Sequence, residues 1–87
     1  MRIGDDVAWT QGAQRVVALN LVRPDAQPVV LEGTAAFVWE EIAVEAPSDL
    51  DALVTGVAQV FEVSADLIRG DVEQLVAVLR TRALIEE

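Results

Sequence analysis

The spacing of apolar residues in this 87-residue chain changes once, near Gly33-Thr34. Before that point, apolar and polar residues alternate in short runs rich in β-branched side chains, which is typical of strands. After it, apolar residues recur every three or four positions, which is typical of helices that bury one face. Because the strands come first and the helices follow, the sequence predicts an α+β fold with the helices packed on one face of an antiparallel sheet.

Three strands are expected before the change of spacing. Residues 6–10 and residues 15–22 have strand character and are joined by a turn at residues 11–13, and a loop around Pro24 leads to a third strand at residues 28–31. Pro28 has no N–H to donate, and proline is tolerated mainly at strand starts or on sheet edges. The sequence therefore predicts a three-stranded antiparallel meander whose third strand has one unpaired side.

Three helices are expected in the remainder: residues 34–45, a second helix capped at Ser48, and residues 65–82 capped by Ser64. Their expected core positions are Ala35, Val38, Trp39 and Ile42, then Leu50, Leu53, Val54, Val57 and Phe61, then Ile68, Val72, Leu75 and Leu79. The last apolar pair, Leu84-Ile85, could add a short strand or cover the core. A chain this short rarely holds two separate cores, so residues 1–87 are interpreted as one domain.

Composition removes most catalytic chemistry. The chain has no Cys and no His, so it offers no disulfide, thiolate ligand, imidazole ligand or imidazole base. Its only serines, Ser48 and Ser64, have no histidine to activate them. We therefore expect no catalytic residue, no metal site and no cofactor, and we interpret the chain as a binding protein.

The net charge of the chain argues against two classes of binding partner. Six Arg and no Lys stand against 15 acidic residues, for a formal net charge of −9. Binding to nucleic acid or to an anionic membrane relies on basic surfaces, so neither partner is expected. No apolar run approaches the roughly 18 residues of a membrane span. The sequence predicts a cytoplasmic protein.

The third predicted helix has more apolar surface than one core line needs. At about 100° per residue, a second stripe lies beside the core line, and it contains Leu67, Asp71, Val78 and Arg82. The stripe either widens the buried face or forms one wall of a groove, and helix statistics favour neither interpretation. If it faces an unpaired strand edge at residues 29–31, an extended peptide could add a strand between the two.

Two further apolar side chains lie off the core line of the first predicted helix. Phe37 and Val44 are seven residues apart and so lie on the same side of that helix. They are either isolated surface hydrophobes or a docking patch for a second protein.

An acidic, helical chain of this size also suggests an acyl carrier protein, in which a serine at a helix start holds the prosthetic arm. The Asp-Ser-Leu attachment pattern is missing here, because Ser48 follows Pro47 and Ser64 lies between Val63 and Ala65. A carrier function would need a degenerate attachment motif.

Three segments together resemble a known family. Residues 30–40 (VLEGTAAFVWE) form a strand ending in leucine that runs into an alanine-rich helix with a Val-Trp pair. Residues 49–54 (DLDALV) begin a helix with acidic residues, and residues 68–79 (IRGDVEQLVAVL) contain an Asp-Val pair and precede the apolar ending Ala83-Leu84-Ile85. In this order and spacing, they resemble the PqqD-like family, the leader-peptide recognition elements of ribosomal-peptide modification systems.

This resemblance implies a winged helix-turn-helix fold and a peptide ligand. Family members bind the leader of a precursor peptide as a strand added to the third strand, in a groove walled by the third helix. The implied peptide-binding residues are Val29, Val30, Leu31, Leu67, Asp71, Leu75, Val78 and Arg82. The chain looks most like the small leader-binding protein of split lasso-peptide systems, which delivers the precursor to a separate transglutaminase-like leader peptidase. One departure is Glu32-Gly33, where family members often have Asn and Pro.

A winged-helix DNA-binding regulator is the competing function, because it shares the architecture. Its recognition helix would here carry Asp66, Asp71 and Glu73, which are a poor match for phosphates.

Overall fold

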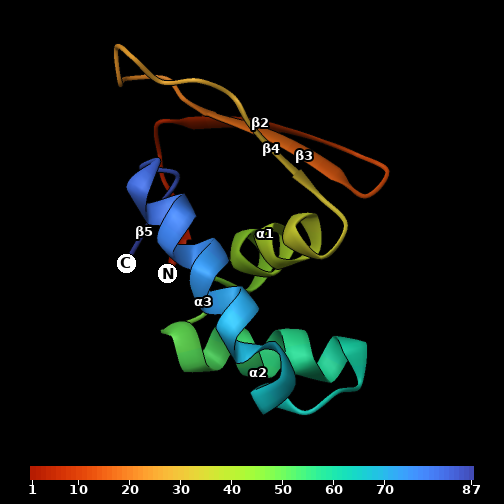
Figure 1. Ribbon diagram of the computed structural model, residues 1–87. Helices are drawn as coiled ribbons and strands as arrows, with labels where there is room; N and C mark the ends of the chain where they lie inside the picture. The colour runs from red at the N-terminus through yellow and green to blue at the C-terminus, as the bar shows by residue number, and fades with distance from the viewer.

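The computed structural model describes residues 1–87 and has an α+β fold (Figure 1). The elements in chain order are β1 (Arg2–Ile3), β2 (Val7–Gly12), β3 (Arg15–Asn20), β4 (Val29–Glu32), α1 (Thr34–Glu45), α2 (Leu50–Phe61), α3 (Ala65–Thr81) and β5 (Ile85–Glu86). Strands β2, β3 and β4 form an antiparallel sheet in that order, and β1 pairs with β5 in a second, two-stranded sheet. The α+β class and the meander followed by three helices are confirmed.

The elements are arranged in layers (Figure 1). The three-stranded sheet lies over α1, and α2 lies on the far side of α1 from the sheet. Helix α3 follows α2 after the tight turn at residues 62–64, which gives the helix-turn-helix, and the sheet is the wing. Strand β1, which was not predicted from the sequence, holds the chain start against β5.

The strand limits differ slightly from those predicted. The β2–β3 turn lies at residues 13–14 instead of 11–13, with Gln14 in the left-handed region at φ 55°. Strand β3 ends at Asn20 instead of Val22, because the Asn20 side-chain Oδ1 accepts from the backbone N–H groups of Val22 and Arg23. That side chain starts the β3–β4 loop.

Local hydrogen bonds set the helix starts. Gly33 has φ 61°, a backbone conformation that glycine adopts without steric cost, and it turns the chain from β4 into α1. Helix α2 is capped by Asp49 and not by Ser48, since the Asp49 carboxylate accepts from the N–H of Ala52 at 2.8 Å. Ser64 caps α3 as predicted.

The core lies between the sheet and the helices. Its most deeply buried side chains include Val16 and Ala18 of the sheet, Val38, Trp39 and Ile42 of α1, Leu53, Val54 and Val57 of α2, Val72, Val76 and Leu79 of α3, and Leu84. Three core positions predicted in α1 and α2 are not fully buried. Ala35 and Leu50 are half-buried, with Ala36 buried beside the former, and Phe61, at the end of α2, is 41% exposed.

On α3 the buried residues are Val72, Val76 and Leu79. Val76 was not among the predicted core positions, and the predicted positions Ile68 and Leu75 are only half-buried. The apolar surface of α3 is broader than one contact face, and α3 packs chiefly on α2 and also against β5. The packing partners therefore select which part of that surface enters the core.

Candidate functional site

The outer edge of β4 carries unpaired backbone groups. No strand lies beyond β4 in its sheet. The N–H of Gly33 donates to the C=O of Gln14 (N···O 3.0 Å), and hydrogen-bonded and non-hydrogen-bonded pairs alternate along an antiparallel ladder. The backbone groups of Leu31 therefore face β3, whereas those of Val30 and Glu32 point away from it. An added strand would use these outward groups.

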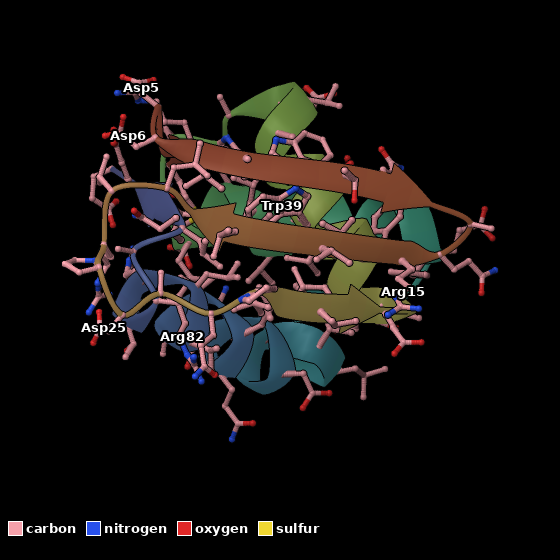
Figure 2. The ribbon with its side chains drawn as sticks, turned by 90° about the horizontal axis from the view of Figure 1, so that it is seen from above. Asp5, Asp6, Arg15, Asp25, Trp39 and Arg82 are labelled. Atoms are coloured by element: carbon pink, nitrogen blue, oxygen red, sulfur yellow. The ribbon has the colours of Figure 1, made fainter.

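In Figure 2, α3 lies beyond the β4 edge with its C-terminal end toward the start of β4, and Figure 1 shows that the helix slants away from the sheet toward α2 at its N-terminal end. Strand β4 packs on β3 and α1 and makes no comparable contact with α3. We call the surface between the outer edge of β4 and α3 the β4–α3 groove. One pocket lies where β4 leads into α1 and another at the loop before β4, and neither has a β4 residue in its lining.

The pocket at the end where β4 leads into α1 is apolar. It has a volume of about 210 Å³, and its lining is Thr34, Ala35, Val38, Val57, Ile68, Asp71, Val72 and Leu75. An apolar cavity of about 150 Å³ admits a benzene ring, so this pocket can take a peptide side chain up to aromatic size. Asp71 is the only charged group in the lining and lies at its margin as an exposed residue.

The recess at the opposite end, where β4 begins, is polar. It has a volume of about 190 Å³, and its lining is Asn20, Arg23, Asp25, Ala26, Gln27, Thr81, Arg82 and Leu84. Figure 2 shows Asp25 and Arg82 at this end of the molecule and Arg15 at the other. The two ends of the groove therefore differ in chemistry.

Arg69 and Arg2 have a raised pKa, and neither residue lines a pocket of the groove. Arg69 donates to Asp51 at 2.6 Å, which ties α3 to α2, and this hydrogen bond raises the pKa of Arg69. The pKa of Arg2 is raised chiefly by its hydrogen bond to Asp5.

The structure brings several of the predicted site residues together. Asp71 and Leu75 line the apolar pocket, and Arg82 lines the polar recess. On β4, Val30 is exposed, Val29 is half-buried and Leu31 is buried at 5% exposure. The backbone of Leu31 thus belongs to the existing sheet and is not free for a new strand.

Other predicted residues lie elsewhere. Leu67 and Val78 are 75% and 47% exposed and line neither pocket, so their place on the groove wall stays a prediction. Phe37 is half-buried, and its ring contacts that of Phe61 edge-on with the centroids 4.9 Å apart. Val44 is 78% exposed. A docking role for these two residues stays a prediction.

Sequence reasoning missed two parts of the site. Ile68 was assigned to the core, because helical periodicity does not separate a buried position from a pocket wall. Asn20 and Arg23 carried no signal, since they approach the end of α3 only in the folded chain.

Two kinds of feature are absent from the structure. No group of three or more acidic, histidine or cysteine side chains is placed to hold a metal ion. None of the helices combines the length and apolar character needed to cross a membrane.

Comparison with known proteins gives two matches. The sequence profile of the family described as coenzyme PQQ synthesis protein D (PqqD) matches residues 15–85. Among solved structures, the fold is similar to "TbiB1 in Complex with the TbiA(beta) Leader Peptide", with a TM-score of 0.77, 20% sequence identity, and coverage of 99% of this chain and 95% of that one. No curated protein sequence matches significantly.

Proposed function

The chain belongs to the PqqD family, and on that premise we propose that it binds the leader segment of a ribosomally synthesised precursor peptide as a strand added to β4. The observation that carries the proposal is the outward-facing backbone groups of Val30 and Glu32 on the unpaired edge of β4, with an apolar pocket where β4 leads into α1. The similarity to a protein described in complex with a leader peptide supports it.

In this binding mode, β4 and the apolar pocket have separate roles. Backbone hydrogen bonds to Val30 and Glu32 give affinity that is largely independent of the peptide sequence. Side chains of an added strand alternate between two faces, and those on the inner face reach the pocket lined by Ile68 and Leu75. Selectivity then comes from the side chain that fills this pocket.

We further propose that the protein presents the leader, in the cytoplasm where the precursor is made, to a separate transglutaminase-like leader peptidase of a lasso-peptide system. In this role the chain binds and does not cleave. A mixture of precursor and purified protein is expected to keep the peptide intact. Cleavage that persists in a preparation free of the peptidase would contradict a purely binding role.

Amide hydrogen exchange tests the binding mode. The probe is a synthetic peptide with the leader sequence of a short precursor, identified by a search of the reading frames that neighbour this gene. Exchange is expected to slow at Val30 and Glu32, because their N–H groups gain partners, and to change little at Leu31, whose N–H already faces β3. Protection confined to another surface, with Val30 and Glu32 unchanged, would refute strand addition at β4.

A further inference from the structure

We propose that the polar recess at the start of β4 binds a side-chain carboxylate of the peptide, and that this contact fixes the direction and register of the peptide in the groove. The ligand class is an Asp or Glu residue of the bound strand, held by Arg23 and Arg82. This inference rests on the proposed function, because it needs a peptide in the β4–α3 groove.

Half of the six arginines form no ion pair. Arg2, Arg69 and Arg80 each pair with a carboxylate, whereas Arg15, Arg23 and Arg82 do not, although the chain has 15 acidic residues. Arg15 lies at the start of β3, outside the recess. Arg23 and Arg82 line the same recess.

Hydrogen bonds hold the recess in place. Asn20 is 9% exposed; its amide donates to the C=O of Ala83 at 2.7 Å, and its Oδ1 accepts from the N–H of Arg23 at 3.1 Å. The Arg23 guanidinium donates to the C=O of Thr81 at 3.0 Å. Because a guanidinium has five N–H donors, Arg23 is anchored and still has donors for a ligand.

Asp25 is the one acidic residue in the lining. Its carboxylate forms no ion pair with Arg23 or Arg82, so it occupies neither guanidinium. One negative charge beside two positive charges leaves the recess net positive. An incoming carboxylate can therefore meet two guanidinium groups, which bind carboxylates with strong, oriented hydrogen bonds.

The two ends of the groove carry charges of opposite sign. Asp71 lies at the apolar pocket and Arg82 at the recess, so the groove has opposite charges at its two ends. From residue 71 to residue 82, a helical rise of about 1.5 Å per residue gives about 16 Å, which an extended peptide spans in about five residues. Residues that share a face of a strand are an even number apart. We therefore expect the acidic residue about four or six positions from the apolar residue that fills the pocket.

The global charge of the protein makes this signature specific. A net charge of −9 disfavours acidic peptides in general. An acidic residue enriched at one fixed position would run against that trend and would have to come from a local contact.

The test is a selection from a library in which 12 random residues are flanked by neutral linkers, displayed as peptides on their own messenger RNA. It is run on the wild type, on Arg82→Gln and on Arg80→Gln. Arg80 is the matched control: it lies in the last turn of α3, two residues before Arg82, its substitution removes the same charge, and it pairs with Glu87 without lining the recess. Thermal melting checks that both variants fold.

Wild type and Arg80→Gln are expected to enrich peptides with an apolar residue and an Asp or Glu about four or six positions away. Arg82→Gln is expected to keep the apolar residue and lose the acidic preference. Apolar strands without an acidic preference on the wild type, or the same preference on Arg82→Gln, would overturn the inference and leave the proposed function standing. No enriched peptide on the wild type would overturn the proposed function and the inference with it.

Affinity measurements on the strongest selected peptide give a second readout. Changing its acidic residue to the matching amide is expected to weaken binding to wild type by about tenfold, since hydrogen bonds to charged groups are among the stronger ones. The same change should have little effect on Arg82→Gln, because the partner is already missing. An equal loss in both proteins would contradict a contact with Arg82.

Discussion

Replacing Val78 with Asp is expected to weaken leader binding by at least about tenfold while leaving the fold intact. Val78 lies on α3 between Leu75 of the apolar pocket and Arg82 of the recess, and its side chain is 47% exposed in the free protein. Complete burial of a valine is worth about 1.5–3 kcal/mol, so covering the exposed half with peptide is worth about 1 kcal/mol. Forcing a carboxylate into that contact costs at least about 1 kcal/mol more. The sum, about 2 kcal/mol, corresponds to roughly a thirtyfold loss.

The stability of the folded protein should change little, because exposed helix positions tolerate substitution within about 0.5 kcal/mol. Val60→Asp is the matched control. Val60 is 54% exposed, lies in the last turn of α2 as Val78 lies in the last turn of α3, and lines a pocket outside the groove. Both changes thus add one negative charge near a helix C-terminus, where it is unfavourable. Only the Val78 change places that charge on the expected groove wall.

The assay is titration of a fluorescent leader peptide, with thermal melting as the check on folding. Val78→Ser separates the two contributions, because it removes the apolar contact without adding charge and should lose only a few-fold in affinity. Wild-type affinity in Val78→Asp would remove this face of α3 from the binding site. An equal loss in Val60→Asp would assign the effect to total charge and refute the reasoning.

The remaining predictions concern the apolar pocket, the core residue Val76 and the polar recess. Leu75→Ala should lower peptide affinity, and it should also lower the free energy of unfolding by about 1–2 kcal/mol, since Leu75 is half-buried. Val76→Ala should lower the free energy of unfolding by about 2 kcal/mol, measured by urea unfolding, and leave the peptide affinity of the folded protein unchanged. Asp71→Asn should lose affinity and some salt dependence if Asp71 contacts a basic or polar peptide group; unchanged affinity and salt slope would show that it is a solvated helix residue. Asn20→Ala should destabilise the protein by about 2–3 kcal/mol, because it leaves the C=O of Ala83 and two backbone N–H groups without their partner; a stability within 0.5 kcal/mol of wild type would contradict the role assigned to this side chain.

The edge position of β4 could be predicted from the sequence, because Pro28 cannot donate to a ladder and because strand order followed chain order. The sequence could not predict which backbone groups are free on that edge. Alternation in an antiparallel ladder depends on the phase of pairing with β3, and the Gly33–Gln14 hydrogen bond sets that phase. Val30 and Glu32, and not Leu31, are therefore the expected partners of an added strand.

The core positions of α3 were likewise predictable only in part from the sequence. The periodicity of α3 correctly placed Val72 and Leu79 in the core, but Val76 took the place predicted for Leu75. Apolar residues cover more of α3 than one contact face, and their spacing does not say which neighbour each will meet. In the folded chain Val76 is buried, whereas Ile68 and Leu75 line a pocket with Val57 of α2.

The sequence by itself determined the class of fold, the edge strand and the acidic character of the chain, because these follow from periodicity, from proline and from counting charges. Only the tertiary structure decided that the side chains of Arg23 and Arg82 lie in the same recess. Arg23 follows the end of β3 and Arg82 follows the end of α3, and they line one recess because Asn20 and Arg23 bond to the chain at the end of that helix. Contacts between residues so distant along the chain depend on how strands and helices pack together, and no local pattern encodes them.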